Sequence, residues 1–170
     1  QAEDGIRDFC LSRGLGDVYK RQTSDMPVMQ KAAKFLDEME IPFEINALSA
    51  HRTPEMVEEF ASNAHKNGIK VIIAGAGGAA HLPGMIASLS PLPVIGVPIS
   101  ATDLKGVDSL YSIVQMPRGY PVATMAIGSS GAFNAAIFAI QVLAVSDRLI
   151  RQKIQDWRSD TTNRVKDEPE

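Results

Sequence analysis

Hydrophobic and polar positions follow a regular pattern from residue 23 onward. Apolar blocks of strand or helix length alternate there with short segments rich in glycine, proline and serine. The run at 71–74 is apolar throughout, which is typical of a parallel strand buried on both faces. Alternation at this spacing predicts right-handed βαβ units in a three-layer α/β sandwich with a parallel sheet. The predicted strands are 43–48, 71–74, 94–97 and 121–124, and the predicted helices are 25–39, 53–68, 81–89, 107–114 and 131–151.

The beginning of the chain departs from this pattern. A first strand is expected just before Ser24, but the segment 16–22 is polar apart from Val18 and Tyr19. Residues 1–22 mix charges and glycines without a clear period, and they do not resemble a secretion signal. We therefore expect a first strand that is replaced or degenerate, and a source gene that encodes other residues there. The expected organisation is a non-native or disordered leader (1–22), a single domain (23–158) and a polar C-terminal tail (159–170).

Composition narrows the class of protein. A chain of 170 residues that is 45% hydrophobic fits one ordinary domain, and its formal net charge of −3 offers no broad basic field for a nucleic acid. No apolar run is long enough to predict a membrane span. The single cysteine, Cys10, can form no internal disulfide or zinc cluster, and the three histidines would need carboxylates to hold a metal. These features predict a reduced, soluble, cytoplasmic protein without a metal site.

Three turns that follow predicted strands carry the candidate chemistry. They span 24–25, 49–53 and 75–81, and the carboxyl ends of parallel strands are where open sheets bind ligands. Arg52 suits a phosphate because its planar guanidinium can donate two parallel hydrogen bonds, and Asp25 could accept hydrogen bonds from sugar hydroxyls. For each residue taken singly, the favoured explanation is a helix cap for Asp25 and Thr53 and a solvated surface position for Arg52. Their expected position along one edge of the sheet favours the ligand site.

The glycine-rich turn at 75–81 fits the loose dinucleotide pattern G-x-G-x-x-A, which is a weak signal. A nicotinamide site also requires an acidic residue at the end of the next strand, and no carboxylate follows until Asp103. The turn also lacks the Gly-Lys-Ser/Thr ending of a nucleoside-triphosphate loop. Bare backbone against a flat ligand and a tight turn that needs positive φ both remain open.

Histidine is the side chain best suited to exchange protons near neutral pH. His51 stands beside Arg52 at a predicted strand end, so we predict a catalytic, proton-transferring role for it. His81 begins a predicted helix, where lining the site and simply capping and packing are equally plausible. His65 lies at an exposed helix end and is expected to be solvated.

At these residues the chain resembles a known family over 23–151. It is similar to the class I N5-carboxyaminoimidazole ribonucleotide mutases of purine biosynthesis, the PurE family, also known as the catalytic subunit of phosphoribosylaminoimidazole carboxylase. In order and with continuous spacing, the matching motifs are Ser24-Asp25, Ser49-Ala50-His51-Arg52-Thr53-Pro54, the run 75–85 (GAGGAAHLPGM), Asp108-Ser109-Leu110 and the run 112–117 (SIVQMP).

The resemblance implies a flavodoxin-like fold, no metal or organic cofactor, and transfer of a carboxylate from the exocyclic nitrogen to carbon 4 of an aminoimidazole ribonucleotide. It implies that His51 shuttles the proton, that Asp25 holds the ribose, and that Arg52 and Ser24 hold the phosphate. Released carbon dioxide would be trapped near the glycine turn by proximity and exclusion of water. The substrate-binding residues implied are Ser24, Asp25, Ser49, Ala50, Arg52, Gly75, Ala76, Gly77, Gly78, Ala79 and His81.

One motif departs from the family pattern. The family's first strand ends in Gly-Ser-x-Ser-Asp, whereas this chain reads Arg21-Gln22-Thr23-Ser24-Asp25. The serine that Gln22 replaces normally helps to bind the phosphate, so weakened substrate binding is expected.

The resemblance also implies a homo-oligomer, an octamer. The segment 131–145 is apolar nearly all round, which predicts burial at a subunit interface. Two other functions stay open: a related carboxylase that uses free carbon dioxide, and a non-catalytic nucleotide-binding module. In the related carboxylases, which form class II of the family, lysine usually follows the site histidine. Arg52 at that position therefore favours the mutase.

Overall fold

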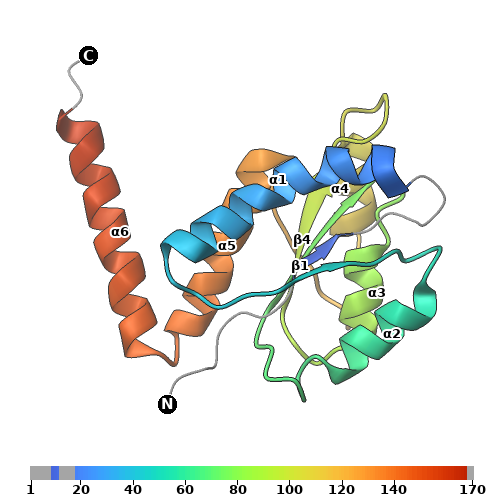
Figure 1. The fold of residues 1–170 in the computed structure, drawn as a ribbon, viewed down its shortest axis with the longest axis horizontal. Helices are drawn as coiled ribbons and strands as arrows, with labels where there is room; N and C mark the ends of the chain where they lie inside the picture. Colours follow the sequence, from blue (N-terminus) through green and yellow to red (C-terminus); the bar gives the residue numbers. More distant parts are fainter. Residues whose placement is uncertain (1–8, 12–17, 168–170) are drawn as a thin grey trace.

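A computed structural model describes residues 9–11 and 18–167, with side chains described for 26–166, as a parallel sheet between two layers of helices (Figure 1). The strand order is β2-β1-β3-β4-β5 and every neighbouring pair is parallel. This confirms the predicted flavodoxin-like α/β fold. The elements are β1 (Phe9–Leu11), α1 (Val18–Glu38), β2 (Ile45–Ala47), α2 (Pro54–Asn63), β3 (Ile72–Gly77), α3 (Leu82–Leu89), β4 (Val94–Ile99), α4 (Val107–Val114), β5 (Ala123–Thr124), α5 (Ser129–Ala144) and α6 (Arg148–Asp167).

The sheet separates two hydrophobic cores. Strands β3 and β4 are buried along their whole length, and their side chains alternate between the two faces. In β3, Ile73 packs toward α1, α5 and α6, whereas Ile72 and Ala74 pack toward the core that includes residues of α2, α3 and α4. The prediction that 71–74 is a strand buried on both faces is therefore confirmed.

The first strand lies earlier in the chain than predicted. Strand β1 (Phe9–Leu11) occupies the place between β2 and β3, with Phe9 opposite both Ile45 and Ile73. The segment directly before Ser24, where the pattern placed a strand, instead begins α1 at Val18. The apolar triplet Phe9-Cys10-Leu11 suits a central strand better than the polar residues at 16–22 do. Strand β1 and the first residues of α1 thus fall within the range interpreted as a leader.

Helix α1 also starts before its predicted cap. Asp25 was expected to cap a helix with Pro27 in its first turn, but both residues lie inside α1 (Val18–Glu38), so this prediction is wrong. Pro27 has no N–H to donate to the carbonyl of Thr23, which explains why the sequence signals a helix start there. The backbone of Ser24 and Asp25 is helical, whereas their side chains lie outside the described residues.

The predicted helix over 131–151 is divided into α5 and α6. Asp147 ends the turn between them, where its Oδ1 accepts hydrogen bonds from the backbone N–H groups of Leu149 (2.8 Å) and Ile150 (3.1 Å). This is the bonding of an N-cap, and it starts a second helix in a new direction. Helix α6 continues to Asp167, so most of the predicted polar tail is helical.

Helix α6 packs against the body through its first half and stands beside it in Figure 1. The Trp157 ring lies 5.0 Å from that of Phe35 of α1, measured between centroids. Lys153 Nζ donates to Glu40 Oε2 at 2.6 Å, and this hydrogen bond and the lysine charge lower the pKa of Glu40. The Glu40 side chain is largely solvated and that of Lys153 is partly so, which weakens this ion pair, so the aromatic contact is the stronger attachment.

The apolar helix α5 is buried within its own chain. Its buried residues, such as Ala136 and Ile140, belong to the core that α1, β3, β4 and α6 complete. Much of the helix is thus covered within the chain, partly by α6, while Phe138 stays 38% exposed, so burial of α5 at a subunit interface stays a prediction. None of the helices in the described ranges combines the length and apolarity needed to cross a membrane.

Candidate functional site

Two predicted turns meet at the carboxyl edge of the sheet. His51 follows β2 and His81 follows β3, and their Nε2 and Nδ1 atoms lie 2.7 Å apart. The two rings stand edge to face, with centroids 4.8 Å apart. Because β1 separates β2 from β3 in the sheet, the two turns reach toward each other from either side of β1. This is the switch point at which open α/β sheets bind ligands.

The turn that carries His51 is held by its own hydroxyl groups. Thr53 Oγ1 accepts from the Ser49 N–H at 3.1 Å and is within 3.2 Å of the Ser49 carbonyl, to which it can donate. Ser49 Oγ in turn accepts from the Arg52 N–H at 3.3 Å. Thr53 therefore occupies the N-cap position of α2 without capping it by its side chain. With Ser49 and Ala50 buried, His51 and Arg52 are the residues that the turn presents to solvent.

The glycine-rich segment divides into strand and turn. Residues 75–77 end β3, and the turn proper begins at Gly78, whose φ of 66° favours glycine. A Cβ on Gly77 would lie 2.5 Å from Ala101 Cβ and 3.2 Å from the Ile99 carbonyl oxygen, so glycine there permits a close approach of the segment after β4. The positive φ expected from the sequence is thus found at Gly78, whereas the glycine at 77 is explained by a contact within the chain, and bare backbone against a flat ligand stays a prediction.

His81 lies at the start of α3 without capping it. No side-chain cap hydrogen bond forms there, and the imidazole contacts His51 instead. Of the two roles left open for His81, the structure supports the one in the site. Of the residues around it, Ala79 is exposed, whereas Gly75, Ala76, Gly77, Gly78 and Ala80 are buried and can offer a ligand little besides backbone.

The three predicted turns do not all come together as expected. Ser24 and Asp25 lie within α1 rather than in a turn, and their side chains are not among those described. The structure therefore brings together the turns at 49–53 and 78–81 and leaves the first turn's contribution a prediction. The described residues contain no group of three or more histidine, cysteine, aspartate or glutamate side chains placed to hold a metal ion.

Sequence reasoning missed a further element beside this site, the segment between β4 and α4. Thr102 Oγ1 donates to Asp108 Oδ2 at 2.7 Å. This hydrogen bond lowers the pKa of Asp108, while burial of the carboxylate acts in the opposite direction. Asp108 belongs to the motif Asp108-Ser109-Leu110, but that motif does not include Thr102, so the sequence does not reveal the contact between the two residues.

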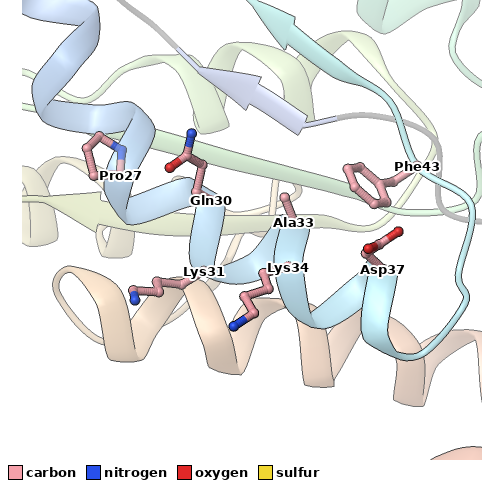
Figure 2. Close-up of a pocket in the computed structure, with 7 residues that line it drawn as sticks. All are labelled: Pro27, Gln30, Lys31, Ala33, Lys34, Asp37 and Phe43. Atoms are coloured by element: carbon pink, nitrogen blue, oxygen red, sulfur yellow. The ribbon is translucent and has the colours of Figure 1, made fainter.

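An open cavity of about 540 Å³ lies elsewhere, along α1 (Figure 2). It is lined by Lys31, Lys34 and Asp37 of α1 and by Phe43 ahead of β2, among others. Lys34 is largely exposed and pairs with Glu38 at 3.7 Å. None of the candidate site residues lines this cavity, so it is separate from the histidine pair.

Comparison with known proteins gives consistent matches. The family model described as AIR carboxylase matches residues 18–164. An N5-carboxyaminoimidazole ribonucleotide mutase of Haemophilus influenzae is 56% identical over 147 residues, which cover 86% of this chain and 90% of that protein. A phosphoribosylaminoimidazole carboxylase of Candida glabrata is 55% identical over 147 residues, but these cover only 25% of that longer protein. The crystal structure of Treponema denticola PurE superimposes with a TM-score of 0.80 over 94% of this chain and 93% of that chain, at 22% identity, which bears on the fold alone.

Replacing Gly77 with alanine should destabilise the fold. The new Cβ would lie 2.5 Å from Ala101 Cβ, so strand end and loop must move apart, at a cost of about 1–3 kcal/mol. Urea unfolding followed by circular dichroism measures the change. Gly84→Ala is the matched control, because its Cβ would meet only the flexible end of Met116 and alanine favours helix. Equal midpoints for the two variants would contradict the close approach at Gly77.

Proposed function

Because the chain belongs to the AIR carboxylase family, we propose that it is an isomerase of purine biosynthesis, an N5-carboxyaminoimidazole ribonucleotide mutase. It moves the carboxylate of that ribonucleotide from N5 to carbon 4, forming 4-carboxy-5-aminoimidazole ribonucleotide. The observation that carries the proposal is the contact of His51 with His81 at the switch point, in a chain more than half identical to relatives with this name.

The reaction requires one proton to change places. When the N5–CO2 bond breaks, the nitrogen gains a proton, and when carbon 4 has attacked the carbon dioxide, it must lose one. We assign both transfers to His51, which donates a proton to the nitrogen as the N5–CO2 bond breaks and then recovers one from carbon 4, so that it ends the cycle as it began. In the contact of His51 Nε2 with His81 Nδ1, one ring donates and the other accepts, which orients both rings and leaves each with a second nitrogen.

Substrate binding is assigned to groups around this pair. Arg52 is exposed beside His51 and suits the phosphate, and the backbone of Ser49 and Ala50 borders the same turn. The turn that begins at Gly78 would face the ring and the trapped carbon dioxide. Roles for Ser24 with the phosphate and Asp25 with the ribose rest on the motif alone. The chain needs neither a metal nor an organic cofactor for these steps.

Assembly into a homo-oligomer, an octamer in the cytoplasm, completes the proposal. Exposed apolar side chains follow one face of α4: Val107 is 44% exposed, Tyr111 65% and Val114 48%. Their spacing of four and three residues places them in one stripe of the helix, and contiguous apolar surface of this kind marks interaction sites. We therefore assign a subunit contact to α4, beside the contact expected for α5.

The assay that tests the function uses the carbamate substrate without ATP or added bicarbonate. A mutase should convert it at full rate, because the transferred carbon dioxide comes from the substrate itself. The alternative function to be tested is that of a carboxylase, because one relative of this chain carries that name. Turnover that depends on added bicarbonate would favour that carboxylase, and no turnover under either condition would favour a binding module.

Replacing His51 with asparagine should lower kcat by about 10²–10⁴-fold, because the general acid–base group is lost. Ligand affinity, measured by calorimetry, should change little, since Arg52 and the turn remain. The matched control is His65→Asn at an exposed position after α2, for which wild-type turnover is expected. If H51N keeps turnover within a few-fold of wild type, His51 does not carry the proton.

Replacing Tyr111 with glutamate should break the assembly. A charge in the apolar stripe would lose its hydration on association, which disfavours the contact. Light scattering should report a smaller species for Y111E and the wild-type mass for Tyr111→Phe, which keeps the ring. An unchanged mass for Y111E would remove α4 from the subunit interface.

A further inference from the structure

We propose that Asp108 is a positioning residue of the site, which acts through Thr102 to hold the segment 100–106 against the end of β3 that leads to His81. The proposal rests on the proposed function for the identity of the ligand. It assigns Asp108 no contact with the substrate. The segment 100–106 is the loop between β4 and α4, on the β4 side of the histidine pair.

The segment and the end of β3 are in direct contact. Gly77 pairs with Ile99 in the sheet, and the space where a Gly77 side chain would lie is taken by Ala101. A displacement of the segment at Ala101 therefore changes the support of the backbone that turns at Gly78 toward His81. Thus the position of the segment bears on the geometry of the histidine pair.

The segment 100–106 adopts a backbone conformation that its residue types do not favour at Lys105, so other interactions must hold it. Lys105 has a φ of 53° and Gly106 a φ of 88°, so two consecutive residues lie in the left-handed region, which side chains such as lysine adopt rarely. Thr102 supplies the compensating bonds. Its carbonyl accepts from the Lys105 N–H at 3.1 Å, its Oγ1 accepts from the Leu104 N–H at 3.2 Å, and its Oγ1 donates to Asp108.

The carboxylate of Asp108 is placed at some cost to stability. Its Oδ2 accepts from Thr102, but its Oδ1 is buried and has no hydrogen-bond partner among the described residues. The first turn of α4 favours a negative charge, yet a buried oxygen without a partner is unfavourable. The hydrogen bond from Thr102 to Oδ2 is the interaction that offsets this unfavourable burial.

Helix α4 is held in place by a different hydrogen bond from the one that holds the loop. Ser109 Oγ, which is buried, donates to the Ile99 carbonyl oxygen at 2.8 Å and ties α4 to the end of β4. This bond runs to β4 and not to the loop, and Ser109 adds to the hydrogen bond from Thr102 in lowering the pKa of Asp108. Loss of the Thr102–Asp108 hydrogen bond should therefore loosen the segment 100–106 and leave α4 in place.

Thr102→Val tests the proposal, because valine keeps the shape and removes the hydroxyl, and Thr102→Ser is the matched control that keeps it. T102V should raise KM by about tenfold, because it removes the hydrogen bond to the Asp108 carboxylate together with the longer one from the Leu104 N–H, while kcat stays within about twofold. T102S should keep KM within about twofold of wild type. Asp108→Ala combined with T102V should raise KM no further than T102V alone, because both remove the same bond.

Limited trypsin digestion gives a readout that does not depend on activity. Cleavage after Lys105, identified by mass spectrometry, should be several-fold faster in T102V than in wild type or T102S. An unchanged cleavage rate would overturn the proposal, and so would faster cleavage with an unchanged KM, since the bond would then be merely structural. If the wild-type chain does not turn over the ribonucleotide, the proposed function fails, while faster cleavage in T102V would still support the role of the bond.

Discussion

The close approach of β3 and the segment after β4 at residue 77 constrains everything on the carboxyl edge of the sheet. A glycine there lets Ala101 occupy the space that a side chain would need. From this contact one backbone leads through Gly78 to His81, and the other leads through Thr102 to α4. The buried pairing of β3 with β4 thus sets the places of the turn after β3 and of the segment after β4, and β2 leads to the turn that carries His51.

Much of the fold follows from the order of apolar blocks, because β3 and β4 are too apolar to lie anywhere but inside a sheet covered on both faces. The errors arise where two signals compete. Pro27 is typical of a helix start, but α1 begins at Val18, ahead of it. Strand β1 is short and set in a polar neighbourhood, so its three residues give no periodic signal.

The sequence predicts which residues belong to the candidate site, but it does not predict which of them touch. His51 and Arg52 stand out as residue types after a strand, but the contact of His51 with His81 joins residues 30 positions apart and depends on the strand order around β1. The apolar helix α5 shows the opposite case. Its composition predicted burial, and much of that cover comes from α1, the sheet and α6, whose N-cap at Asp147 reverses the chain after α5.

Two adjacent residues at the start of α4 form hydrogen bonds with different parts of the chain. Ser109 secures the helix to β4, whereas Asp108 reaches back to the loop ahead of it. Because Ser109 ties α4 to β4, substitutions at the exposed positions 103–105 can accumulate without weakening the core, whereas Ala101 and Thr102 are constrained by their contacts with Gly77 and Asp108. A fold built in this way can change the shape of a pocket wall during evolution and keep its stability, which would let one architecture adapt to ligands of different size.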